Sequence, residues 1–283
     1  MTTTILTFQT PDNVTLTAEA WGDPSGRPVL MSHGGGQTRH AWKQTGEKLA
    51  EQGWYAVAYD HRGHGESDWS PDGEYSIERF AKDQDIVRQH FDQPPALVGA
   101  SLGGLSAIAL QDMTNEDVYS SLILVDITPK MNQEGAMRIM EFMEENMHEG
   151  FADLNEAAEV IAQYTGRKKR INNEGLRKNL RLHNDGRYRW HWDPKFLKLR
   201  TDQTANPERL NKAVSVLAYP VFLVRGMMSE VVTEEVAQQF LNDVPHAEYM
   251  DVEDASHMVA GDRNDVFTDG IIDFLSRQNN TRP

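Results

Sequence analysis

The chain has 283 residues, with 28 Lys and Arg against 43 Asp and Glu, which gives a formal net charge of −15. It contains no cysteine, so disulfide scaffolds, thiolate metal sites, iron–sulfur clusters and cysteine nucleophiles are excluded. The acidic balance argues against a nucleic-acid partner, because phosphate binding needs clustered Lys and Arg. The length is sufficient for one large α/β domain or two smaller ones.

The first residues, Met-Thr-Thr-Thr-Ile-Leu-Thr-Phe, lack the basic region and the long apolar region of a secretory signal. No apolar run approaches the ~18 residues of a membrane-spanning helix. We therefore expect a cytoplasmic protein without a membrane partner, either a monomer or a homodimer.

Short strands and helices alternate over the first 128 residues. The apolar patterns predict strands at 5–9, 14–21, 28–32, 54–59, 96–99 and 121–125, and helices at 42–51, 77–91 and 102–113. The first two strands form an antiparallel hairpin, and the later alternation is typical of βαβ units with a parallel sheet.

The pattern changes between residues 129 and 218, where no convincing buried strand is found. Helical stretches are predicted there instead, at 136–147, 154–164, 174–183 and 208–217. Strands then resume at 221–225 and 247–252, with helices at 234–242 and 266–277. The sequence thus predicts one α/β core, residues 1–128 and 219–283, interrupted by an all-helical cap, residues 129–218.

The sharpest motif is Gly-Ala-Ser-Leu-Gly at 99–103, between a predicted strand and a predicted helix. This context makes a G-x-S-x-G pattern a nucleophile elbow, in which a tight turn projects the Oγ of Ser101 above the sheet. The N–H of Leu102, at the positive end of the helix, can face a developing oxyanion.

A second motif, His-Gly-Gly-Gly at 33–36, follows another buried strand. An oxyanion hole needs a second backbone N–H on a facing loop, and glycine lets that backbone approach a substrate closely. We assign this donor to Gly35, with Gly36 as the alternative. His33 is expected to be a structural residue beneath the loop and not a base.

A serine nucleophile needs a base, and the base needs an acid. His257 is the best candidate base, because it lies in a loop after the last predicted strand. Glu230 follows the strand at 221–225, so the order Ser101, Glu230, His257 is the one expected on this architecture. The rival acids are Asp126, at the end of its own strand and the most serious rival, and Asp251, Asp254 and Asp262, near His257.

The chain resembles the α/β-hydrolase-fold serine hydrolases, in particular the capped subgroup with epoxide-hydrolase-like proteins, cofactor-free haloperoxidases, small esterases and acyl-homoserine lactonases. The resemblance rests on five motifs in order: HGG at 33–35, DHRGHGES at 60–67, GASLGG at 99–104, LVRG…SEVV at 223–232 and HMVAGDRND at 257–265. It implies a mostly parallel eight-stranded sheet with helices on both faces and an inserted helical cap. It also implies that 60–67 is a structural turn and not a metal cluster.

Two positions depart from the family pattern. Glu230 stands where the acid is usually Asp, although Glu is accepted in some members. Ser101 stands where epoxide hydrolases and haloalkane dehalogenases carry Asp, and serine cannot form the alkyl-enzyme ester of those reactions. The epoxide hydrolase and dehalogenase activities are therefore rejected.

The pattern as a whole predicts a serine hydrolase that cleaves an apolar carboxylic ester or lactone through an acyl-enzyme on Ser101, without metal or cofactor. Thioesterase, C–C bond hydrolase and perhydrolase or haloperoxidase uses of the same triad remain as alternatives. So does a non-catalytic ligand-binding protein of the same fold, since fold alone does not fix function.

Residues that could line the substrate pocket come from three places. Gly36 belongs to the glycine loop and Met258 follows the predicted base. Met140 belongs to a helix whose methionines share one face, which could be packing or an adaptable acyl-pocket wall. Trp190 and Trp192 could line the cavity between cap and core or only fix the cap in place.

Overall fold

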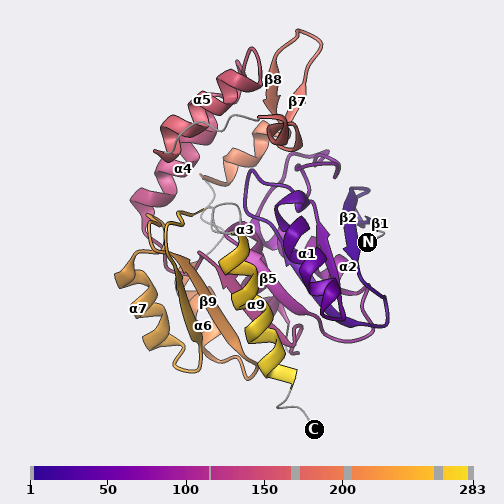
Figure 1. Ribbon diagram of the computed structural model, residues 1–283, viewed down its shortest axis with the longest axis vertical. Coiled ribbons are helices and arrows are strands. Elements are labelled where there is room, and N and C mark those ends of the chain that lie inside the picture. Colours follow the sequence, from indigo (N-terminus) through magenta and orange to yellow (C-terminus); the bar gives the residue numbers. More distant parts are fainter. Residues whose placement is uncertain (1–2, 115, 167–172, 201–205, 258–263, 280–283) are drawn as a thin grey trace.

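The computed structural model describes residues 3–114, 116–166, 173–200, 206–257 and 264–279. Its centre is an eight-stranded sheet with the strand order β1-β2-β4-β3-β5-β6-β9-β10 (Figure 1). Strand β2 pairs antiparallel with β1 and β4, and the other neighbouring pairs are parallel. The prediction of a mostly parallel eight-stranded α/β sheet is confirmed.

The predicted strands are found within one or two residues of their expected bounds. They are β1 (Thr4–Gln9), β2 (Thr15–Trp21), β3 (Arg27–Ser32), β4 (Trp54–Tyr59), β5 (Ala96–Ala100), β6 (Ser121–Val125), β9 (Val221–Gly226) and β10 (Glu248–Val252). The central strands β4, β5 and β6 are buried at every position, as expected for strands covered on both faces.

Two layers of helices cover the sheet. On one face, Trp42, which lies just before α1, and Leu49 of α1 pack with Phe267 and Phe274 of α9. The other face is covered by α2, α3, α6 and α7. The helices are α1 (Lys43–Glu51), α2 (Ile77–Arg88), α3 (Leu102–Met113), α6 (Pro207–Ser215), α7 (Glu234–Asp243) and α9 (Asn264–Asn279), with a 3₁₀ turn η1 (Arg39–Trp42) before α1.

Polar side chains at the first positions explain where several helices begin. Ser76 accepts the N–H of Arg79 at the start of α2, and Thr233 accepts the N–H of Val236 at the start of α7. Asn206 caps α6 in the same way, with proline at the first helical position. Each cap satisfies amide groups that have no partner within the helix.

The segment between β6 and α6 lies above the carboxyl ends of the parallel strands in Figure 1. It comprises α4 (Gln133–Glu145), α5 (Leu154–Thr165), η2 (Glu174–Lys178), β7 (Leu180–Leu182), β8 (Tyr188–Trp190) and η3 (Pro194–Arg200). Strands β7 and β8 form an antiparallel hairpin, so the prediction of an all-helical segment is wrong. The expected helix at 174–183 is only a 3₁₀ turn followed by β7, whose Leu180 is buried in a small apolar cluster with Phe151 and Leu154.

Helix α6 packs against α3, and its buried residues Leu210, Ala213 and Val214 belong to the main core. It therefore covers the sheet instead of forming part of the segment above it. The boundary expected at 218 stays a prediction, and this packing favours one before α6. The amphipathic pattern of α6 alone could not show which surface it covers.

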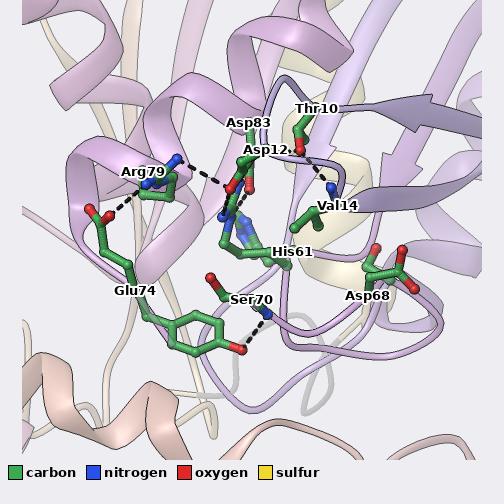
Figure 2. Close-up of polar contacts among 12 residues, drawn as sticks. Thr10, Asp12, Val14, His61, Asp68, Ser70, Glu74, Arg79 and Asp83 are labelled. Carbon is green, nitrogen blue, oxygen red and sulfur yellow. Dashed lines mark hydrogen bonds and ion pairs between the residues drawn. The ribbon is translucent and has the colours of Figure 1, made fainter. Parts of the chain in front are cut away.

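A buried ion-pair network anchors the loop that follows β4. Arg62 is fully buried and donates to Asp83 at 2.6 Å and to Asp12 at 2.8 Å. Arg79 also donates to Asp12, at 3.2 Å (Figure 2). The hydrogen bond from Arg62 holds the pKa of the Asp12 carboxyl well below its usual value. The network fixes the loop against the N-terminal hairpin and α2.

Within the described residues, no helix combines the length and the apolar character needed to cross a membrane.

Candidate active site

The predicted nucleophile occupies the turn between β5 and α3. Ser101 has φ 46° and ψ −113°, a region that residues other than glycine adopt only under strain. A Cβ on Gly99 would lie 2.7 Å from the backbone of the following helix, and one on Gly103 would lie 2.3 Å from the carbonyl oxygen of Ser32. Both positions therefore require glycine. The N–H of Ser101 donates to Val125 at the end of β6, at 3.3 Å.

The residue after Val125 is Asp126, which also has a positive φ, 50°. Its carboxylate is fully buried and accepts a hydrogen bond from His257 Nδ1 at 2.8 Å. The backbone of Asp126 is fixed by a bond from its N–H to Val224 of β9, at 2.7 Å. Hydrogen bonds thus link the turn at Ser101 to the end of β6, and the carboxylate after β6 to His257.

The carboxylate that bonds His257 Nδ1 is that of Asp126, so the expected pairing of Glu230 with this histidine is not found among the described contacts. The carboxylate of Glu230 accepts from Arg138 of α4 at 2.9 Å, and its side chain is 60% exposed. A Cβ on Gly135 would lie 2.1 Å from the carbonyl oxygen of Glu230, so α4 packs tightly on this backbone. The turn after β9 directs Glu230 toward α4, and the end of β6 supplies the carboxylate beside His257.

The glycine loop lies directly against Ser101. A Cβ on Gly34 would lie 3.3 Å from the Cβ of Ser101. The N–H of Gly34 donates to Gln37 at 2.9 Å, and the N–H of Gly36 donates to His64 Nε2 at 3.1 Å. Among the described residues no acceptor bonds the N–H of Gly35. Of the three glycine amides in the loop, this one is available to donate a hydrogen bond to a substrate oxygen.

Buried histidines support the loop from below. The N–H of His61 donates to His33 Nε2 at 3.0 Å, so the proton on His33 Nδ1 is directed to the carbonyl of Gly34, at 2.8 Å. His64 accepts from the loop at Nε2, so its Nδ1 donates to the carbonyl of Arg62 at 3.0 Å. Burial lowers the pKa of His33 to about 4 and that of His64 to about 3. These neutral imidazoles hold backbone groups, which agrees with a structural role for His33.

Large apolar side chains of the upper segment touch the glycine loop. A Cβ on Gly35 would lie 2.8 Å from the ring of Phe196, which is 4% exposed. A Cβ on Gly36 would lie 2.8 Å from Met143 Cε and 3.6 Å from Trp192 Nε1. The sequence pointed to Trp192 and to the methionine face of α4, but it did not single out Met143 or Phe196.

The other predicted pocket residues are placed differently. Met140 is partly buried and packs against the main core. Trp190 stands edge-on to Phe151 at 5.3 Å, within the small apolar cluster of the hairpin. Met258 lies outside the described residues. None of the described residues forms a group of three His, Asp or Glu side chains placed to hold a metal ion.

The comparison with protein families agrees with this geometry. The family model of the alpha/beta hydrolase fold matches residues 27–263, which is most of the chain. The protein therefore belongs to the α/β-hydrolase-fold family, and the sequence-based identification is confirmed.

Individual relatives include several ester-cleaving enzymes. The chain is 30% identical over 260 residues to Esterase Rv0045c of Mycobacterium tuberculosis, covering 88% of this chain and 82% of that protein. It is 24% identical to the 3-hydroxybutyrate-oligomer hydrolase of Cupriavidus necator, covering 84% of this chain and 85% of that protein. The crystal structure of E-2-(acetamidomethylene)succinate hydrolase matches with a TM-score of 0.81 at 22% identity, covering 97% of this chain and all of that one, and shows the fold. The esterases among the relatives support an ester-acting hydrolase.

Proposed function

We propose that the protein is a serine hydrolase that cleaves a carboxylic ester or lactone through an acyl-enzyme on Ser101. The observation that carries the proposal is the 2.8 Å hydrogen bond between His257 Nδ1 and the buried carboxylate of Asp126. It supports a triad of Ser101, His257 and Asp126. The 30% identity to a mycobacterial esterase supports the ester as the class of bond cleaved.

The tautomer of His257 follows from its partner. Asp126 bonds Nδ1, so the proton of a neutral imidazole lies on that nitrogen and Nε2 can accept the proton of Ser101. Ser101 then attacks the carbonyl carbon, and the protonated His257 returns the proton to the leaving alcohol. In a second step of the same kind, water activated by His257 attacks the acyl-enzyme and releases the carboxylic acid product from Ser101.

The oxyanion is held by two backbone amides in this proposal. One is the N–H of Leu102, the first residue of α3, which has no partner within the helix. The other is the N–H of Gly35, which no described acceptor takes. Losing one such donor typically costs ~10²–10³ in kcat.

A substrate with an apolar part is supported by the side chains above the glycine loop. Phe196, Trp192 and Met143 are all less than one-tenth exposed and contact Gly35 or Gly36. We propose that the segment from α4 to η3 acts as a cap that limits the size of the substrate and excludes water. The chemistry of the triad requires no metal or organic cofactor.

The test is ester turnover together with active-site labelling. The wild-type protein should hydrolyse p-nitrophenyl acetate and take up one equivalent of a fluorophosphonate. Ser101→Ala should not be labelled, and its kcat should be roughly 10⁵–10⁶-fold lower. Ser121→Ala removes another buried serine hydroxyl, at the far end of β6, and should change neither.

A wild-type protein with neither label nor turnover would contradict the proposal and favour a ligand-binding protein of the same fold. Turnover that survives in Ser101→Ala would contradict the serine mechanism.

A further inference from the structure

The last residue of β9, Gly226, and the turn that follows it, residues 227–229, supply two hydrogen-bond donors to the carboxylate of Asp126. The N–H of Gly226 donates to Oδ1 at 2.9 Å, and the hydroxyl of Ser229 donates to Oδ2 at 2.5 Å. The second oxygen is the one that His257 Nδ1 also bonds. Three donors therefore converge on a carboxylate with no exposed surface.

The hydroxyl of Ser229 has a fixed direction. Its oxygen accepts the N–H groups of Val231 and Val232, each at 3.2 Å. A hydroxyl has one proton and two lone pairs. Both lone pairs face amide donors, so the proton is directed to Asp126. Ser229 is itself 7% exposed, and water has little access to compete.

The same turn also holds the loop that carries the base. The N–H of Met227 donates to Val252 at 3.0 Å, and the N–H of Met228 donates to Ala255 at 2.8 Å. A Cβ on Gly226 would lie 2.6 Å from the carbonyl oxygen of Ala255. The turn thus contacts the acid on one side and the approach to His257 on the other.

We propose that Ser229 is a positioning residue of the hydrolase, which acts on catalysis through Asp126. Its hydroxyl holds Oδ2 of Asp126 toward His257 and stabilises the charged carboxylate. The inference rests on the proposed function and extends it by a fourth side chain. Glu230, the neighbour that the family pattern suggested as the acid, has no part in it.

The physical reason lies in how the carboxylate is held. Without Ser229, Oδ2 would be bonded only by His257, the very group that Asp126 must orient. Only that bond and the contact of Oδ1 with the N–H of Gly226 would then oppose rotation of the carboxylate about its Cβ–Cγ bond. A hydrogen bond to a charged group contributes about 1.5 kcal/mol or more, which corresponds to about a tenfold change in rate.

A double-mutant cycle tests this role, with p-nitrophenyl acetate as substrate. Ser229→Ala should lower kcat about tenfold and leave KM within twofold, because the substrate contacts are intact. In the Asp126→Asn background the same substitution should change kcat less than twofold, since the group it acts through is already impaired. Ser121→Ala, the buried-serine control, should have no effect in either background. Thermal unfolding of each variant checks that the fold is retained.

Two results would overturn the inference. One is a tenfold loss in both backgrounds, which would show a general structural effect. The other is a change of less than twofold in the wild-type background. Either result leaves the proposed function standing as long as Ser101→Ala is inactive, whereas an active Ser101→Ala would refute the proposed function itself.

Discussion

The carboxyl edge of the sheet and the segment from α4 to η3 are held by different kinds of interaction. At the edge, Asp126 is fully buried and takes three hydrogen bonds, and its backbone is tied to β9. In the segment, Arg138 is 50% exposed in its ion pair with Glu230, which is 60% exposed, and Arg189 is 23% exposed in its ion pair with Asp185, which is 49% exposed. Its own apolar cluster is small, with four buried residues.

This difference suggests different roles for the sheet edge and for the upper segment. Buried, fully bonded polar groups have one arrangement, and losing a partner is costly. Exposed pairs contribute little, and the elements that they join can shift. We therefore expect changes at the sheet edge to act on kcat, and changes in the upper segment to act on stability and substrate range.

The largest effect is expected at Asp126, the proposed acid of the triad. Asp126→Asn should lower kcat by about 10⁴-fold, because an amide at this place favours the wrong tautomer of His257. Glu230→Gln is the matched control, since it also replaces a carboxylate by an amide, and it should change kcat less than twofold. The measurement is steady-state hydrolysis of p-nitrophenyl acetate by both variants. A large loss in Glu230→Gln with an active Asp126→Asn would reverse the assignment.

The choice of the acid shows which features could be predicted from the sequence and which could not. The strands, the elbow and the order of the motifs follow from local patterns, so they could be predicted within a few residues. Choosing between Asp126 and Glu230 depends on where the turn after β9 directs its side chains. That direction is set by bonds between residues about 100 positions apart, such as the one from Gly226 to Asp126, and no local pattern carries them.

The second prediction concerns the ring above the oxyanion loop. Phe196→Ala should lower the free energy of unfolding by about 3 kcal/mol, as expected for a buried aromatic side chain. It should also raise activity on p-nitrophenyl octanoate relative to the acetate, because the space over Gly35 is opened. Phe142, which stacks on Tyr164 at 3.9 Å and is only partly buried, provides the control. Phe142→Ala should cost less stability and leave the acyl preference unchanged.

Denaturant unfolding and the ratio of the two ester rates measure this prediction. An unchanged ratio in Phe196→Ala would show that the ring is packing for the loop and not a wall of the acyl pocket.

The third prediction is a pH dependence of stability. The buried histidines beneath the glycine loop stay neutral in the folded state, with the pKa of His64 lowered to about 3 by burial. In the unfolded chain an imidazole takes up a proton as the pH falls through ~6.5. The unfolded state therefore binds more protons, and the free energy of unfolding falls as the pH decreases from 6.5 toward 3.

His64→Gln removes one of these groups. The loss of unfolding free energy between pH 7 and pH 5 should then be smaller by about 2 kcal/mol than in the wild type. Urea unfolding at the two pH values measures the difference. His246→Gln, at an exposed position, should leave the loss unchanged. An equal loss in wild type and His64→Gln would mean that His64 is protonated in the folded state.

The upper segment was the least predictable part of the chain. Residues 174–183 carry a helical pattern, but Leu180 is buried in the small cluster of the hairpin, and β7 forms instead of a helix. A three-residue strand gives too short an alternation to be recognised. Phe196 was likewise missed, because its contact with Gly35 joins residues 161 positions apart.

The smallest effect is expected at the exposed contact between the two regions. Arg138 and Glu230 are 50% and 60% exposed, so solvent screens their attraction. Arg138→Ala and Glu230→Gln should each lower the free energy of unfolding by less than about 0.5 kcal/mol. Neither should change kcat for p-nitrophenyl acetate. Both variants and the double variant, unfolded in urea, give the coupling between the two side chains.

A coupling well above 1 kcal/mol would contradict this view, because an exposed pair would then be stabilising the segment as strongly as a buried one. A small coupling would leave the backbone contact between Gly135 and Glu230 as the main connection at this point. That contact depends on shape and not on charge, so raising the salt concentration should change the free energy of unfolding by the same amount in both variants and in the wild type.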